Sequence, residues 1–349
     1  MQIFHNPQHQ RHAGRHEMFR GRLVDCHEVP ERLEHVLAAL RRRGIGDLSE
    51  PARLSPLDMA LLRRVHKPAY LDFLARAWDD WVALDPANAA LDILPSVWPN
   101  HGLRRDVEPL NFSAQVGRYA FDAGSPITAG TWEAALAGAA CALDAARAVG
   151  AGASGAMALT RPPGHHAGAD FYGGYCFVNN TALAAQALRD GGAEKVAVID
   201  VDYHHGNGTQ SIFYERADVF TASLHGDPRT EYPFYLGYAD ELGAGAGLGA
   251  NLNLPLPIGT GFDAWQVGLR QLIGQAQKHG ADALVVALGV DTFEGDPISR
   301  FTLRGADYAR VGEMLAAMDL PTVFVMEGGY AVEALGDNVA GVLEGFLAA

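Results

Sequence analysis

The sequence predicts an α/β fold, with a parallel sheet covered by helices on both faces. From residue 155 onward, apolar runs of strand length alternate with amphipathic helical stretches. The runs are almost continuously apolar rather than alternating, which is typical of strands buried on both faces of a parallel sheet. They span residues 155–160, 195–200, 218–225, 251–256, 283–291 and 322–330.

Four segments carry the strongest helical patterns. In 31–44 the apolar residues recur at helical spacing, and Gly44 is a plausible C-terminal stop. In 131–150 we expect Thr131 at the N-cap, with Glu133 in the first turn. Segments 179–192 and 262–280 separate predicted strands and supply the covering helices.

Residues 84–130 interrupt this pattern with several prolines and glycines and no clear period. A long irregular segment in a compact domain is usually functional or disordered. The sequence shows no internal repeat and no linker composition, so we expect one domain over 1–349.

Composition narrows the function classes. The net charge is −14, without the basic footprint of a nucleic-acid-binding protein. An acidic surface favours cationic partners, although solubility alone explains such a charge more often. The three cysteines are widely spaced, and no signal peptide or long apolar run is visible, so we expect a cytoplasmic protein without a membrane segment.

Titratable residues follow four of the predicted strands. Ligands of open α/β sheets bind beyond the carboxyl ends of the strands, so these side chains should meet at one edge. The groups are His165 and His166 after 155–160, Asp200, Asp202, His204 and His205 after 195–199, Asp291 after 283–290, and Glu327 and Tyr330 after 322–326.

Asp202, His204 and Asp291 are predicted to bind zinc. Residues two apart in extended backbone point to the same side, so Asp202 and His204 can hold one ion, and Asp291 can add a third ligand. Two carboxylates, one imidazole and an open position are typical of a catalytic zinc site. The alternative is a loop cap beside a hydrogen-bonded core histidine, but the clustering of titratable groups favours the metal.

His165 and His166 are candidates for proton transfer, because imidazole titrates near neutral pH. One ring could face a metal-bound water while a buried carboxylate, for which Asp200 is the candidate, holds its neighbour. Tyr330 could donate to a developing oxyanion. The alternatives are two surface histidines in a proline-rich turn, and a tyrosine that merely packs at a strand end.

Six motifs in this chain resemble the zinc-dependent histone deacetylase superfamily, and most closely its bacterial acetylpolyamine amidohydrolase branch. They are RPPGHHAG, GGYCFVNN, DVDYHHGNGTQ, SLHGDP, LGVDTFEGDP and MEGGY, in the family's order within about residues 130–345. The resemblance implies an arginase-like three-layer fold with a sheet of about eight strands. It also implies hydrolysis of an acetamide to acetate and a free amine.

The resemblance assigns roles to individual residues. Asp202, His204 and Asp291 match the zinc ligands, His166 the general base and acid, His165 its electrostatic partner, and Tyr330 the oxyanion donor. Gly174 and Tyr175 match one wall of the substrate tunnel, which Tyr232 faces. Asn207, beside His166, stands where histone-directed members carry aspartate. A potassium site matches Asp200, Ser223 and the carbonyl groups of Asp202, His204 and Leu224.

Three other functions compete with this interpretation. A two-metal ureohydrolase would need further carboxylates where the chain has Gly206 and Phe293, and a metal site requires its full ligand count. A catalytically silent acyl-binding module would lack Tyr330 or one of the tandem histidines. A protein or peptide acetyl-lysine deacetylase remains the main alternative, because the shared chemistry does not fix the substrate.

Segment 84–130 resembles the branch's insertion, which builds a dimer interface and narrows the tunnel mouth. We expect a homodimer, with anchors at Ile93, Leu94, Val97 and Trp98, that deacetylates small acetylated amines. Ser113 and Gly124 occupy positions where polyamine-selective relatives carry acids, which leaves Asp122 as the only acid in 111–126.

For His5, His9, His12 and His16 we favour an ordered loop at the active-site rim over a second metal site.

Overall fold

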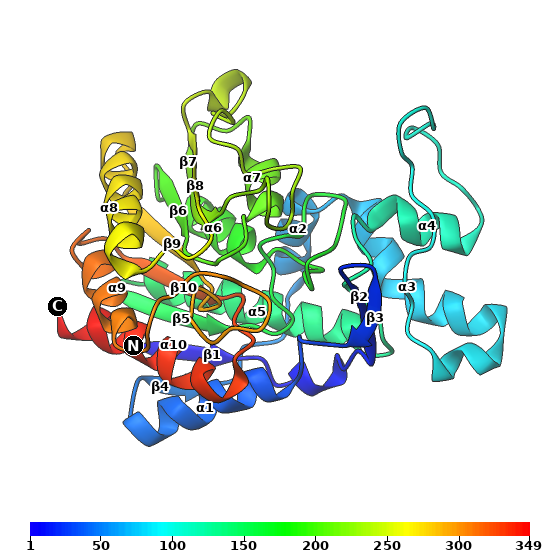
Figure 1. Ribbon diagram of the computed structural model, residues 1–349, viewed down its shortest axis with the longest axis horizontal. Coiled ribbons are helices and arrows are strands. Elements are labelled where there is room, and N and C mark those ends of the chain that lie inside the picture. Colours follow the sequence, from blue (N-terminus) through cyan, green and yellow to red (C-terminus); the bar gives the residue numbers. More distant parts are fainter.

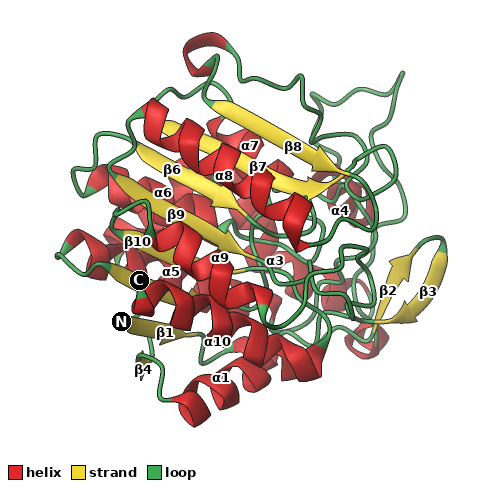
Figure 2. Cartoon of the chain, turned by 60° about the vertical axis from the view of Figure 1, so that its left-hand side comes forward, coloured by secondary structure: helices red, strands yellow, loops and turns green.

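An eight-stranded, entirely parallel sheet forms the centre of the computed structural model, which describes residues 1–349 (Figure 2). Every neighbouring pair runs in the same direction, in the order β4-β1-β5-β10-β9-β6-β7-β8. The strands are β1 (Gln2–His5), β4 (Asp47–Ser49), β5 (Gly155–Leu159), β6 (Val196–Asp200), β7 (Val219–Gly226), β8 (Asn251–Leu256), β9 (Ala283–Leu288) and β10 (Thr322–Met326).

Two apolar cores lie on opposite faces of this sheet. In β5, Ala156 and Ala158 belong to one core and Met157 and Leu159 to the other, as expected for side chains that alternate along a strand. The first core is covered by α2 (Pro56–Val65), α3 (Pro68–Leu84), α5 (Thr131–Gly150) and α6 (Asn180–Asp190). The second is covered by α1 (Glu31–Arg43), α8 (Phe262–His279), α9 (Asp307–Ala316) and α10 (Val332–Ala348). The predicted fold class is therefore confirmed.

Helix ends follow the sequence signals closely but not completely. Gly44 and Gly280 end α1 and α8 in the left-handed conformation, which glycine adopts without a steric penalty. The expected N-cap at Thr131 is wrong, because Gly130 is the cap and Thr131 is the first helical residue. The Thr131 hydroxyl instead accepts a hydrogen bond from the Thr128 amide at 2.7 Å.

The two strands of the central sheet that apolar runs did not reveal are β1 and β4. Both are short, and in β4 the side chains are exposed or half-buried, so the usual signal is absent. The parallel register Gln2↔Ala156 places β1 beside β5, while a separate antiparallel hairpin joins β2 (His16–Phe19) to β3 (Arg22–Asp25).

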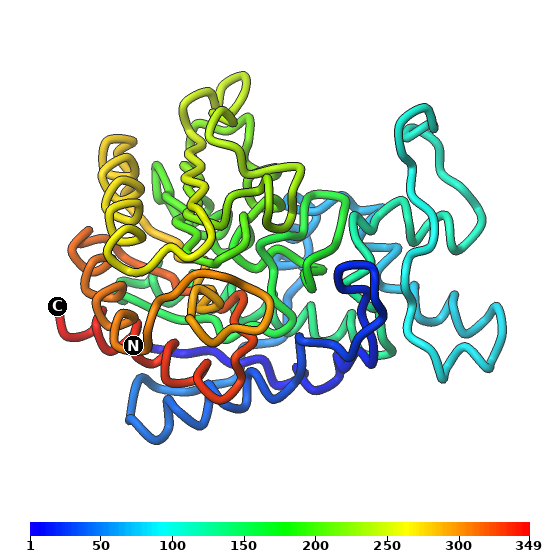
Figure 3. Tube along the Cα trace, viewed as in Figure 1, coloured from blue at the N-terminus to red at the C-terminus, as the bar shows by residue number.

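Segment 84–130 projects from the side of the molecule, as the cyan part of the trace shows (Figures 1 and 3). It contains the 3₁₀ helix η2 (Pro86–Ala90) and the α-helix α4 (Phe112–Tyr119), so it is less irregular than its composition suggested. The Asn111 side chain caps α4 by accepting from the Ala114 amide at 3.3 Å. The remaining short helices are η1 (His9–Arg11), α7 (Asn207–Phe213) and η3 (Gly245–Gly247).

Because all eight strands are parallel, their carboxyl ends meet at one edge, where the side chains expected to carry chemistry lie. None of the helices combines the length and the apolar character that crossing a bilayer would require.

Candidate active site

A cavity of about 380 Å³ opens at the carboxyl edge of the sheet. Loops that follow β5, β6, β7, β9 and β10 reach it, together with the hairpin β2–β3 and the end of segment 84–130. Six residues predicted from the sequence line this one cavity: His166, Gly174, Tyr175, His204, Tyr232 and Tyr330.

Asp202, His204 and Asp291 form a compact buried group beside the cavity. Their potential ligand atoms lie within 4.8 Å of one another. His204 Nδ1 is 2.9 Å from Asp291 Oδ2 and 3.4 Å from Asp202 Oδ1. Burial and the neighbouring charge of Asp202 raise the pKa of Asp291 to about 7. Two carboxylates and one imidazole at this spacing fit a divalent metal, whose charge would offset the negative charge that burial makes costly.

Glycines make room for this group. A Cβ atom on Gly289 would lie 2.0 Å from Asp202 Oδ2, and one on Gly328 would lie 2.5 Å from the same oxygen. The Gly328 amide donates to Asp202 Oδ2 at 2.7 Å, so the backbone approaches the carboxylate directly. The glycines next to the strand ends are therefore required by the close packing of the candidate metal ligands.

The tandem histidines make different contacts. His165 Nδ1 lies 2.9 Å from Asp200 Oδ2, and His166 Nδ1 lies 2.6 Å from Asn207 Oδ1. Burial alone would lower the pKa of His165, but the charges of Asp202 and Asp200 raise it well above its ordinary value. Burial, followed by positive charge at His165 and His204, lowers the pKa of His166 well below its ordinary value. These shifts favour a neutral ring at His166 and a protonated ring at His165.

Glu327 holds the backbone of the histidine loop, a role that sequence reasoning did not assign. Its carboxylate accepts from the amides of Gly164 at 2.6 Å and His165 at 3.0 Å, and from the Thr181 hydroxyl at 2.6 Å. His165, Cys176 and Glu327 also come close enough together to resemble a metal group. Because Glu327 already accepts three hydrogen bonds, we assign it to positioning this loop.

Arg32, from α1, lies beneath Tyr330 and was also missed. Its guanidinium carbon is 4.7 Å from the centre of the Tyr330 ring. The same side chain donates to the carbonyls of Gly329 at 2.7 Å and Glu327 at 2.6 Å. No local sequence pattern indicates this contact, since about 300 residues separate Arg32 from Tyr330.

Two carboxylates fix the aromatic walls of the cavity. The Tyr175 hydroxyl donates to Glu17 at 2.9 Å, and the Tyr232 hydroxyl donates to Asp122 at 2.6 Å. Asp122 also accepts from the Gly174 amide at 2.7 Å, which links the two walls. Gly174 has a positive φ of 54°, and a Cβ there would lie 2.2 Å from the His166 ring.

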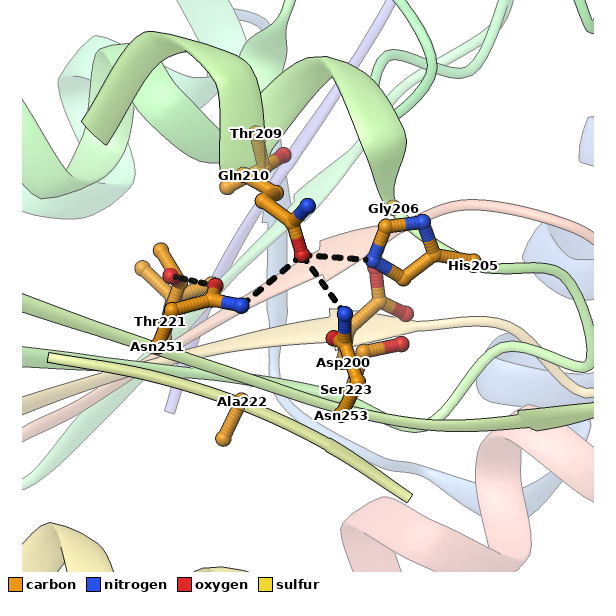
Figure 4. Close-up of a pocket in the computed structure, with 11 residues that line it drawn as sticks. Asp200, His205, Gly206, Thr209, Gln210, Thr221, Ala222, Ser223, Asn251 and Asn253 are labelled. Carbon is orange, nitrogen blue, oxygen red and sulfur yellow. Dashed lines mark hydrogen bonds between the residues drawn. The ribbon is translucent and has the colours of Figure 1, made fainter. Parts of the chain in front are cut away.

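The residues expected to bind potassium are only partly gathered around one space. Asp200 and Ser223 line a cavity of about 10 Å³ behind the candidate metal group, whereas Asp202, His204 and Leu224 do not line it. Figure 4 shows the Gln210 side chain among these lining residues, where its Oε1 atom accepts hydrogen bonds from His205, Asn251 and Asn253. The volume suffices for about one water-sized occupant.

The N-terminal histidines do not come together as a metal-binding group. His5 ends β1, His9 and His12 are buried, and His16 begins β2. The expected loop is thus broken by two strands and a 3₁₀ helix, although the β2 residues Glu17, Met18 and Phe19 do reach the rim of the cavity.

Comparison with known proteins agrees with this geometry. The family model of the histone deacetylase domain matches residues 26–346. Acetylpolyamine amidohydrolase 2 of Pseudomonas aeruginosa is 50% identical over 99% of this chain and 98% of its own length. Acetylpolyamine amidohydrolase of Mycoplana ramosa is 46% identical over 99% of both chains. The crystal structure of acetylpolyamine aminohydrolase from Burkholderia pseudomallei superposes with a TM-score of 0.93 at 39% identity, covering 99% of this chain and 98% of that chain.

Proposed function

The chain belongs to the histone deacetylase family, and from this premise we propose that it is a zinc-dependent amidohydrolase of small acetylated amines. The products are acetate and a free amine. One observation carries the proposal: the Asp202, His204 and Asp291 group lies beside the same cavity that His166 and Tyr330 line. The nearly full-length similarity to acetylpolyamine amidohydrolases supports the substrate class.

We assign one zinc ion per chain to Asp202, His204 and Asp291. When bound, zinc supplies Lewis-acid chemistry, which polarises an amide carbonyl and lowers the pKa of a bound water. A potassium ion behind this group is proposed at Asp200, Ser223 and the carbonyls of Asp202, His204 and Leu224. For potassium the family resemblance is the main support, since only Asp200 and Ser223 line the small cavity.

His166 acts as the general base in this proposal. Asn207 Oδ1 accepts from Nδ1–H, so the lone pair of the neutral ring lies on Nε2. The low pKa keeps the ring neutral before reaction, and the protonated ring can then pass its proton to the leaving amine. His165, held by Asp200, supplies charge beside it.

Tyr330 supplies a hydrogen-bond donor to the oxygen that gains negative charge. Its backbone amide donates to Asp296 at 2.7 Å, and its ring packs on Arg32, so the side chain is held while the phenol faces the cavity. Burial raises the pKa of this phenol well above its ordinary value, which keeps the donor protonated.

Replacing Tyr330 by phenylalanine is expected to lower kcat by about 100-fold, because one oxyanion donor is lost while the ring remains in place. Steady-state kinetics on an acetylated diamine would measure this effect, and metal analysis should show unchanged zinc. A kcat close to that of the wild type would remove Tyr330 from this role.

We further propose that the whole chain forms one deacetylase domain and that segment 84–130 mediates homodimerisation at the tunnel mouth. In support, Val97, Trp98 and Leu110 are 48%, 37% and 95% exposed on the projecting segment. The expectation that Ile93 anchors the dimer is wrong, because Ile93 is buried against its own chain and pairs with Ile127. Light scattering after size-exclusion chromatography should give twice the chain mass, and a monomer at all concentrations would contradict the dimer.

The substrate proposal is tested by turnover across a matched panel. We expect N-acetylputrescine and N-acetylcadaverine to be hydrolysed with a higher kcat/KM than acetyl-lysine peptides. Faster hydrolysis of the peptides would instead establish the alternative, a peptide or protein deacetylase.

A further inference from the structure

Glu231 is a buried acid on the wall of the candidate active site. It lies in the loop after β7, directly before Tyr232, and it lines the same cavity as His166 and Tyr330. The residue is only 3% exposed. Its Oε1 atom is buried without a hydrogen-bond partner, and no lysine, arginine or histidine nitrogen lies within 4.0 Å of the carboxylate. No cationic side chain of the protein therefore pairs with the Glu231 carboxyl group at this cavity.

The other two carboxylates that line the cavity are already engaged. Glu17 accepts from the Tyr175 hydroxyl at 2.9 Å and lies 2.8 Å from His27 Nδ1. Asp122 accepts from the Tyr232 hydroxyl and from the backbone amides of Gly174 and Gly124. Their lone pairs are directed at the walls, so these acids position aromatic rings. Of these three acids, only Glu231 accepts no side-chain hydrogen bond in the protein; its Oε1 atom is enclosed, so a ligand in the cavity would reach the other carboxylate oxygen.

Burial and the neighbouring Glu231 carboxyl group raise the pKa of the Tyr203 phenol well above its ordinary value, so this phenol lies beside Glu231, although neither Tyr203 Oη nor Glu231 Oε1 makes a hydrogen bond of good geometry. A Cβ on Gly226 would lie 2.9 Å from Tyr203 Cζ and 3.0 Å from Glu231 Cγ, so the two side chains pack against the same glycine. A phenol is neutral, however, and a hydrogen bond from it would leave the buried charge of Glu231 uncompensated. A buried carboxylate is costly unless a cation pairs with it.

We propose that Glu231 binds the free ammonium group of an acetylated diamine while the acetamide end lies at His166 and Tyr330. This inference rests on the proposed function and identifies a residue that determines its specificity. The ligand supplies the cation that the carboxylate lacks, and a charge-assisted hydrogen bond is stronger than a neutral one. The two arginines at the cavity, Arg20 and Arg300, form no ion pair with Glu231, so the acid remains available.

The experiment compares N-acetylputrescine with N-pentylacetamide, which replaces the ammonium by a methyl group of similar size. The wild-type protein should prefer N-acetylputrescine in kcat/KM. Glu231→Gln keeps the shape of the side chain and removes its charge. We expect kcat/KM for N-acetylputrescine to fall by about 10- to 100-fold, mainly through KM, as for the loss of a hydrogen bond to a charged group. The value for N-pentylacetamide should stay unchanged.

Tyr203→Phe is the matched control, because it removes the neighbouring hydroxyl without changing charge. Its ratio of kcat/KM between the two substrates should equal that of the wild type. An unchanged ratio in Glu231→Gln, or an equal fall for both substrates, would overturn the ammonium site and leave Glu231 with a structural role. Failure of the wild type to hydrolyse either compound would count against the proposed function itself.

Discussion

His166→Ala is expected to lower kcat for N-acetylputrescine by about 10²- to 10⁴-fold, the range that general acid–base catalysis supplies. The physical reason is the state of this imidazole. Burial and neighbouring positive charge lower its pKa, and Asn207 fixes Nδ1, so Nε2 is the basic atom that alanine would remove. Rates measured at saturating substrate would report this loss in the bound complex.

Two measurements separate catalysis from folding in this variant. His166 is not one of the three candidate metal ligands, so the variant should retain its zinc and melt near the wild-type temperature. His101→Ala, at an exposed position in the projecting segment, is the control and should keep the full rate. A His166→Ala protein with intact zinc and near-wild-type kcat would require another base.

Asp291→Ala is expected to abolish zinc binding and to lower turnover by more than the roughly 10- to 100-fold that outer-sphere residues of metal sites contribute. Removing this carboxylate leaves one aspartate and one histidine, and a metal site requires its full ligand count. Metal content by inductively coupled plasma mass spectrometry, measured beside the kinetics, tests both effects.

The matched control for this variant is Glu294→Ala, which removes an exposed carboxylate three residues further along the same loop. We expect it to retain one zinc per chain and full activity. If Asp291→Ala kept stoichiometric zinc, or if zinc were absent from the wild type after metal loading, the assignment of the ligands would be wrong.

The sheet could be predicted from the sequence wherever a strand is long and buried. The runs that became β5, β6, β7, β8, β9 and β10 are continuous apolar segments between helices, and the structure confirms them. By contrast, β1 and β4 are short, and although Ile3, Phe4 and Leu48 pack against the cores, neither strand presents a long apolar run. Such strands carry no local pattern, because pairing partners far along the chain decide their conformation.

The residues of the candidate active site also divide into those with a local sequence signal and those without one. The strand-end rule located Asp202, His204 and Asp291, because each follows directly after an apolar run. Arg32 and Glu231 were missed, because Arg32 in α1 packs on Tyr330, and Glu231 in the loop after β7 lines the cavity, from segments without a recognisable motif. Their importance depends on which partners they have or lack after folding, and only the structure reveals that.

The most direct test of the central claim is a product balance by proton NMR with the zinc-loaded wild-type protein and N-acetylputrescine. The account predicts equimolar acetate and putrescine at a rate proportional to protein concentration, and loss of this activity in Asp291→Ala. Substrate that stays intact with fully zinc-loaded protein, or equal product formation by Asp291→Ala, would contradict it.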